Sequence, residues 1–226
     1  MSHPTMRNFD LRRWVQRWNG GVTAPPPRCV WLTLDDGPDP VLTERILRVL
    51  DRHRVKATFF MIGKKVEAHG SVARRVFEAG HRIGNHTYSH RRLTELAAPD
   101  VREEIQRADG LLADYSRNDK IFRPPYGALN ATVEAVAAGL GHQTILWDVD
   151  ATDWDLPFQP KGWIRKCVWQ IENGDGGIVL THDNLKTTAE YYDLFIRRIK
   201  AIGSITFGDP ALLSVPGSRT AADRPA

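Results

Sequence analysis

The amino-acid sequence predicts an α/β fold, because short apolar runs typical of buried strands alternate with longer amphipathic segments typical of helices. About seven strand–helix units follow one another, which is the arrangement expected of a parallel barrel or of an incomplete one. The chain has 226 residues, of which 42% are hydrophobic, enough for one substantial core. We therefore expect a single domain over residues 29–213 that folds as a distorted, incomplete (β/α)7 barrel of the TIM type.

The first units are clear in the sequence. Residues 30–35 form an apolar run, and Asp39-Pro40 is typical of the start of a helix. A second buried strand is predicted over residues 57–62 and a helix over residues 71–79. Each strand is thus followed by a helix, as in a βαβ unit.

The middle of the chain repeats this pattern. A short strand over residues 82–85 leads into a histidine pair, and an apolar stripe over residues 101–112 predicts the next helix. Residues 120–122 predict a brief strand that ends in a proline-rich turn, and Asn130 is placed to cap the following helix.

The last units extend to the end of the domain. We expect a long strand over residues 144–149, a helix over residues 163–171 and a strand over residues 177–181. Thr187 to Glu190 reads as a capping box for the last helix, and residues 204–207 as a closing strand.

The two ends of the chain differ from this body. Five arginines and one aspartate in residues 1–28 account for the whole formal net charge of +4. Apolar residues at helical spacing between the arginines predict a short basic amphipathic helix, followed by a proline-rich connector. Such a helix usually packs on its own domain, and peripheral contact with an anionic membrane surface is the alternative. Residues 214–226 are rich in Ser, Pro, Gly and Arg, so we expect a disordered tail.

Composition limits the compartment and the partners. No run approaches the ~18 apolar residues of a membrane span, and no secretory signal is evident. We expect a cytoplasmic protein, or a periplasmic or secreted one if the sequence is a mature form. The balanced charge of the body argues against nucleic acid as a partner, and we expect a monomer. Cys29 and Cys167 are predicted to be thiols.

Polar residues follow several predicted strands at the point where each strand ends. In a (β/α) barrel these ends form the mouth where catalytic groups gather. The residues in question are Asp35-Asp36, His86, Arg123, Asp150 and His182.

Two of these clusters suggest metal chemistry. His86 and His90 are four residues apart, so one turn of helix would direct both imidazoles to the same side. With one carboxylate they would form the three-ligand site of a catalytic zinc. Asp35-Asp36 could supply a ligand and a base, although the residues alone do not say which is which. Histidines at this spacing are common on surfaces, and Asp-Gly-Pro is common in turns.

Taken together, the clusters resemble the five motifs of the NodB-homology polysaccharide deacetylases, carbohydrate esterase family 4. The resemblance covers residues 30 to about 210, with Leu34 in place of the usual phenylalanine of the first motif. The matching segments are Thr33–Pro38, His86–His90, Arg123–Tyr126, Asp150–Trp154 and Leu180–His182.

The resemblance implies a role for each residue near the metal. Asp36, His86 and His90 would hold a divalent ion, Zn²⁺ above all, with Co²⁺ or another divalent ion as alternatives. Asp35 would be the general base that takes a proton from water, and Arg123 would favour its charged form. A surface salt bridge is the alternative interpretation of Arg123.

The resemblance also implies the remaining catalytic groups. The backbone N–H of Tyr126 would donate to the oxyanion, and His182 would protonate the leaving group. By the motif, Asp150 is the carboxylate that orients His182. Asp153, the second acid of this loop, could simply cap the next turn.

The implied substrate is an acetylated glycan. Pro124, Tyr126, Trp154 and Leu180 are expected to contact it, although Trp154 and Leu180 could equally be core residues. The expected activity is metal-dependent removal of acetyl groups from N-acetylglucosamine-containing oligo- or polysaccharides. The alternatives are an O-deacetylase such as an acetyl-xylan esterase, and a non-catalytic glycan-binding protein of the same fold.

Overall fold

The computed structural model describes residues 28–115 and 120–213. The predicted N-terminal amphipathic helix and the predicted tail after residue 213 lie outside the described residues. Arg28, which we assigned to the connector, is the first residue of a strand.

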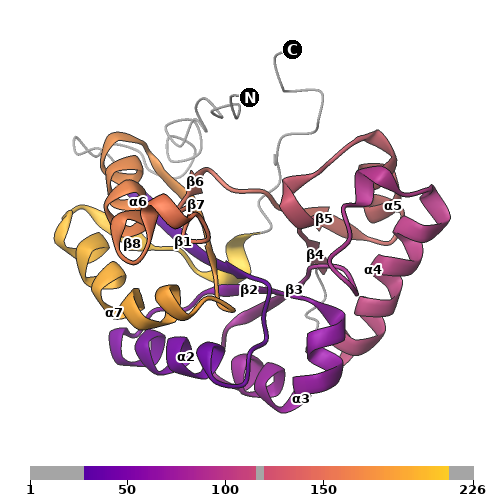
Figure 1. The fold of residues 1–226 in the computed structure, drawn as a ribbon, viewed down its shortest axis with the longest axis horizontal. Coiled ribbons are helices and arrows are strands. Elements are labelled where there is room, and N and C mark those ends of the chain that lie inside the picture. The colour runs from indigo at the N-terminus through magenta and orange to yellow at the C-terminus, as the bar shows by residue number, and fades with distance from the viewer. Residues whose placement is uncertain (1–27, 116–119, 214–226) are drawn as a thin grey trace, which may run out of the picture.

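The described strands form one curved, all-parallel sheet with helices on its outer side (Figure 1). The strand order is β5-β4-β3-β2-β1-β7-β6. The first residues of β1 pair with β8, and its last residues pair with β2. This arrangement confirms the predicted distorted, incomplete barrel, which is open between β5 and β6. The strands are β1 (Arg28–Asp35), β2 (Thr58–Met61), β3 (Arg82–Asn85), β4 (Lys120–Phe122), β5 (His142–Thr144), β6 (Val149–Asp150), β7 (Gly176–His182) and β8 (Ile205–Phe207).

Six α-helices lie within the described residues. Two of them begin as predicted: Asp39 Oδ1 accepts from the N–H groups of Val41 and Leu42 before α2, and Asn130 Oδ1 accepts from the Val133 N–H in α5. The helices are α2 (Leu42–His53), α3 (Gly63–Glu78), α4 (Ala98–Leu112), α5 (Ala131–Gly139), α6 (Gly162–Asn173) and α7 (Lys186–Ala201).

Some boundaries differ from the prediction for physical reasons. Helix α3 begins at Gly63 and kinks at His69, so the predicted helix over residues 71–79 is its second half. The predicted strand over residues 144–149 is two short strands, because the segment between them leaves the sheet and crosses the open side of the barrel. Helix α7 begins at Lys186, so the predicted capping box from Thr187 lies inside it.

Alternation along β1 decides which side chains face the inside of the barrel. Val30, Leu32 and Leu34 are almost fully buried in the cluster that includes the apolar faces of α2, α6 and α7. Thr33 and Asp35 point to the opposite side, because successive side chains of a strand alternate. One face of β1 therefore packs against the helices, and the other face points into the barrel.

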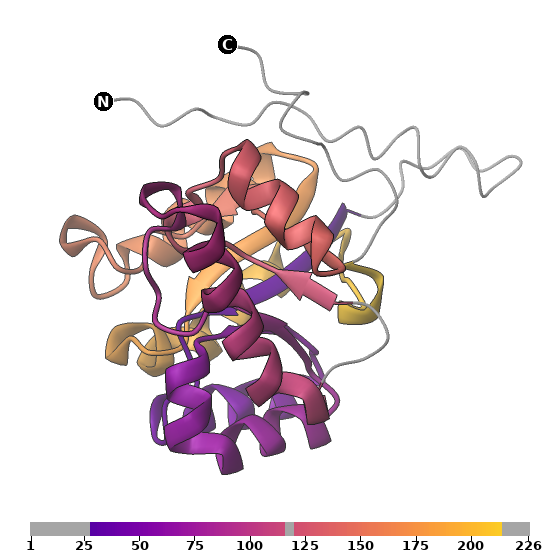
Figure 2. The ribbon, with the colours of Figure 1, turned by 90° about the vertical axis from the view of Figure 1, so that its right-hand side faces the viewer.

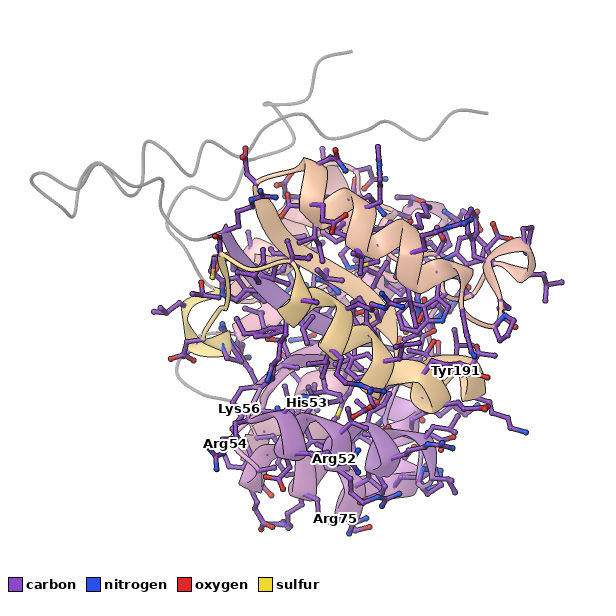
Figure 3. All side chains as sticks on the ribbon, turned by 90° about the vertical axis from the view of Figure 1, so that its left-hand side faces the viewer. Arg52, His53, Arg54, Lys56, Arg75 and Tyr191 are labelled. Atoms are coloured by element: carbon purple, nitrogen blue, oxygen red, sulfur yellow. The ribbon has the colours of Figure 1, made fainter. Side chains whose placement is uncertain are left out.

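The helices are held to one another as well as to the sheet. Helices α4 and α5 pack side by side, and Figure 2 shows them on one outer face. On another face, Arg52 and His53 of α2 contact Asp193 of α7 at 3.2 Å and 2.9 Å, and Figure 3 shows this side of the molecule.

Cys29 and Cys167 are both free thiols, as predicted. Among the described helices, none has the length and apolar character needed to cross a membrane.

Candidate metal centre and active site

The carboxyl ends of neighbouring strands bring the predicted site residues together. Asp35 at the end of β1 and His182 at the end of β7 are partners in the register of the two strands. Arg123 follows β4, and its N–H donates to the carbonyl of Asn85, the last residue of β3 and the neighbour of His86. The site therefore lies at one edge of the sheet, as the sequence predicts.

Asp36, His86 and His90 form a cluster of three potential metal ligands. Asp36 Oδ1 lies 3.4 Å from His86 Nε2 and 3.1 Å from His90 Nε2. One ligand atom from each residue lies within 4.8 Å of the others. The three residues that the family resemblance selects are thus neighbours in space.

The conformation that joins the two histidines differs from our expectation. Residues 86–90 form a loop, so the predicted helical turn is wrong. Thr87 and His90 have φ values of 64° and 61°, in the left-handed region. Both imidazoles nevertheless reach Asp36, with their ring centres 5.0 Å apart.

The donor atoms of this cluster fit a divalent cation. His86 Nδ1 lies 2.7 Å from the Arg123 carbonyl, which can only accept, so the proton is on Nδ1 and the lone pair of Nε2 faces Asp36. Asp36 Oδ1 is buried and has no hydrogen-bond partner among the described residues. Two imidazole nitrogens and a carboxylate oxygen are the ligands of many catalytic zinc sites.

Asp35 is fixed beside this centre by a buried arginine. Arg123 Nη1 donates to Asp35 Oδ1 at 2.7 Å and to Thr33 Oγ1 at 2.8 Å. Its Nε and Nη2 donate to the carbonyls of Ile145 and Leu146, in the segment that crosses the open side of the barrel. Because Arg123 is fully buried, the alternative of a surface salt bridge is wrong. The other oxygen of Asp35, Oδ2, is 3.8 Å from His86 Nε2 and faces the metal cluster.

His182 is oriented by Asp153, so the prediction of Asp150 for this role is wrong. Asp153 Oδ1 lies 2.7 Å from the ring nitrogen Nδ1 of His182. Asp153 Oδ2 accepts from the backbone N–H of His182 and from the Thr188 hydroxyl. Asp150 instead accepts from the Thr152 N–H, in the turn after β6. The reason is register: Asp150 pairs with Leu180, two residues before His182, and the turn returns the chain to His182 at Asp153.

The environment of His182 favours its charged form. Burial opposes the charge, but the Asp153 carboxylate, together with Asp35 and Asp36, raises the pKa of His182 to about 9. Since Nδ1 is held by Asp153, Nε2 is the nitrogen available to donate a proton.

Two exposed aromatic rings flank the mouth. Tyr126 follows β4 and is 58% exposed, and Trp154 follows β6 and is 52% exposed, so they come from opposite arms of the open sheet. The Tyr126 ring lies 4.7 Å from that of His90, and the Arg92 guanidinium lies 4.5 Å from its centre. Pro124 and Leu180 are buried. The substrate contacts of these residues, and the Tyr126 N–H as oxyanion donor, stay predictions.

The sequence reasoning missed several residues that hold Asp36 in place. The Lys65 ammonium donates to the Asp36 carbonyl at 2.7 Å, and the Asn184 amide lies 3.4 Å from Asp36 Oδ2. Asp183 is fully buried against Gly37, where any Cβ would collide with its carboxylate, and it accepts from the Thr43 hydroxyl. Asp183 and Asn184 directly follow a strand end, which is a signal that could have found them. Lys65 lies on a helix, and its position in the sequence carries no comparable signal.

Comparison with known proteins agrees with this geometry. A family model described as polysaccharide deacetylase matches residues 23–145. A peptidoglycan-N-acetylglucosamine deacetylase from Listeria monocytogenes is 37% identical over 173 residues, which are 76% of this chain but 36% of that relative. A chitooligosaccharide deacetylase from Azorhizobium caulinodans is 31% identical over 188 residues, 81% of this chain and 87% of that relative.

A solved structure of similar fold adds a comparison in three dimensions. The carbohydrate esterase family 4 pseudoenzyme from Bacillus anthracis superposes with a TM-score of 0.74 at 30% identity, over 84% of this chain and 67% of that one. The sequence matches, the fold and the clustered motif residues lead to the same conclusion: this chain belongs to the polysaccharide deacetylase family, carbohydrate esterase family 4.

Proposed function

We propose that this chain is a metal-dependent hydrolase that removes acetyl groups from N-acetylglucosamine units of an oligo- or polysaccharide. The observation that carries the proposal is that three groups of residues come together at the carboxyl ends of the strands. They are the Asp36–His86–His90 cluster, the Arg123–Asp35 pair and the Asp153–His182 pair.

Each group has a chemical task in amide hydrolysis. Asp36, His86 and His90 would hold the divalent ion, which when bound supplies Lewis acidity to the acetyl carbonyl and makes water more acidic. Asp35 Oδ2 would take the proton from the attacking water, while Arg123 holds Oδ1 in place.

The second half of the reaction needs an acid. The new C–O bond gives a tetrahedral centre whose oxyanion the Tyr126 N–H would stabilise, as in other acyl-transfer sites. His182 Nε2 would then give a proton to the sugar nitrogen as the C–N bond breaks, so that acetate and an amine leave. Asp153 fixes the tautomer of His182 and stabilises its charge.

The leaving group favours the N-acetyl over the O-acetyl alternative. An amine is expelled only after it is protonated, whereas an alcohol needs the proton less urgently. With its pKa raised to about 9, His182 carries that proton at neutral pH. The names of the peptidoglycan and chitooligosaccharide deacetylases among the relatives also support an N-acetylated glycan.

Acetate release tests the proposal. The purified protein would be treated with a chelator and then reloaded with Zn²⁺ or Co²⁺, with chito-oligosaccharides, peptidoglycan and acetylated xylan as substrates. We expect chelation to abolish acetate release, either ion to restore it, and Asp35→Asn and His182→Ala to lose activity while they still bind metal. Undiminished turnover in either variant would refute the assigned roles.

The same assay separates the alternatives. Release from acetylated xylan alone would identify an O-deacetylase. Glycan binding without acetate release from any substrate would identify a non-catalytic protein, a class that exists in this family.

A further inference from the structure

The loop that carries both histidine ligands has an unfavourable backbone conformation. Thr87 and His90 are both in the left-handed region, which is disfavoured for residues that have a Cβ. Such conformations persist only where surrounding contacts impose them. The position of His90 Nε2 against Asp36 therefore depends on whatever holds residues 86–90.

Helix α3 holds the middle of this loop through its backbone. The N–H groups of Gly63 and Lys64, in the first turn of the helix, donate to the carbonyls of Thr87 and Tyr88 at 2.9 Å and 2.8 Å. These two bonds fix the path of the loop, but they end two residues before His90.

Helix α4 holds the segment next to His90 through one side chain. Glu104 Oε2 accepts from the Ser89 N–H at 2.8 Å, and Glu104 Oε1 accepts from the Ser89 hydroxyl at 2.6 Å. The Glu104 carbonyl also accepts from the Tyr88 N–H at 2.9 Å. The residue is only 8% exposed, so its carboxylate acts in a shielded place, where a charged acceptor binds neutral donors strongly.

We propose that Glu104 is the positioning residue for the metal ligand His90. It holds both donors of Ser89 and so keeps the next residue in the left-handed conformation that points its imidazole at Asp36. The role rests on the metal centre of the proposed function, and Glu104 itself binds Ser89 rather than any of the three ligands.

The test measures metal binding rather than turnover. Zn²⁺ affinity of the full chain would be measured by competition with a chromogenic chelator, and the visible spectrum of the Co²⁺-loaded protein would report ligand geometry. Outer contacts of metal ligands typically change affinity about 10–100-fold, and we expect Glu104→Ala to weaken Zn²⁺ binding within that range. Its Co²⁺ spectrum should also differ from that of the wild type.

Conservative and matched variants sharpen the test. Glu104→Gln keeps one acceptor oxygen for Ser89 and should lose less affinity than Glu104→Ala, and Ser89→Ala should fall between wild type and Glu104→Ala. Glu103→Ala, the same change at an exposed neighbouring position of α4, should leave affinity and spectrum unchanged. If Glu104→Ala does not fold, Glu104→Gln and Ser89→Ala carry the comparison.

Failure of the positioning role and failure of the metal centre give different results. If the wild type binds Zn²⁺ and the Glu104 and Ser89 variants bind it equally well with an unchanged Co²⁺ spectrum, Glu104 is merely structural and the proposal is overturned. If the wild type and His90→Ala show the same negligible binding, the metal centre itself is wrong and this proposal falls with it.

Discussion

Asp153 Oδ1 lies 2.7 Å from the ring nitrogen Nδ1 of His182, and the same carboxylate accepts from the backbone N–H of His182 through Oδ2. Asp153 is completely buried, and the Thr188 hydroxyl is its third donor. A buried carboxylate with donors on both oxygens holds one imidazole orientation, so Asp153 fixes which ring nitrogen of His182 is left available to other groups.

Asp153→Asn should reduce kcat/KM for acetate release by about 10²–10⁴-fold, the range in which a general acid contributes. In the wild type, the Asp153 carboxylate helps to raise the pKa of His182 to about 9. An amide does not stabilise the imidazolium in this way, so the pKa of His182 falls in the variant. The alkaline limb of the pH–kcat/KM profile should therefore move down by about one pH unit or more.

Asp150→Asn is the matched control, because it makes the same change three residues away. The amide oxygen of asparagine can still accept from the Thr152 N–H, so activity and pH profile should stay close to wild type. A loss as large as that of Asp153→Asn would return the orienting role to Asp150.

These two aspartates show where sequence reasoning reached its limit. The sequence correctly predicts that Asp35, His86 and His182 meet, because the carboxyl ends of parallel strands share one edge of the sheet. Which acid reaches His182 depends on the turn after β6, where Thr152 has a φ of 51°, and no local pattern predicts that turn.

The histidine pair illustrates the same limit. A spacing of four residues suits a helical turn, but a loop held by α3 and α4 also brings both rings to Asp36. The supporting contacts come from the backbone N–H groups of Gly63 and Lys64 and from the Glu104 side chain, on helices whose local sequence shows only amphipathic spacing. Long-range packing decides these contacts, so the ligands were predictable and their supports were not.

Arg123→Lys should lower the free energy of unfolding by about 2–4 kcal/mol, although charge is conserved. Lysine cannot reach all four acceptors that the guanidinium binds, so buried carbonyls and the Asp35 carboxylate lose partners. Urea unfolding followed by circular dichroism measures the change. Arg52→Lys, whose side chain is 66% exposed, should change stability by less than ~0.5 kcal/mol, and equal effects of the two substitutions would contradict a structural role for Arg123.

His81 should make the fold sensitive to mild acid. It is 1% exposed, and its Nδ1 accepts from the Ala57 N–H. Burial, aided by the charge of Lys56, lowers the pKa of His81 from 6.5 to about 4. The unfolded chain therefore binds the proton first, so the contribution to stability is complete above pH ~6.5 and is lost as the pH falls toward 4.

The full effect amounts to about 3 kcal/mol at most, from ~1.4 kcal/mol per pKa unit. Urea unfolding at pH 7, 6 and 5 of wild type and His81→Asn isolates it, since the asparagine oxygen can accept from the Ala57 N–H but does not titrate. We expect the wild type to lose more stability than the variant between pH 7 and 5. Parallel curves would show that His81 does not titrate in this range.

Zn²⁺ should stabilise the fold through Asp36, His86 and His90, because a ligand that binds only the native state shifts unfolding by mass action. At free Zn²⁺ about 100 times its Kd, the gain is ~2.7 kcal/mol, which thermal unfolding of the chelator-treated and reloaded protein would reveal as a higher Tm. His90→Ala should lose most of this gain, because two ligands hold the ion far less well than three.

Two controls test the specificity of the gain in Tm. His69→Ala changes a histidine of α3 outside the cluster and should keep the gain. Mg²⁺ should give little stabilisation, because it prefers oxygen ligands. A Tm increase that survives His90→Ala unchanged would place Zn²⁺ elsewhere on the molecule.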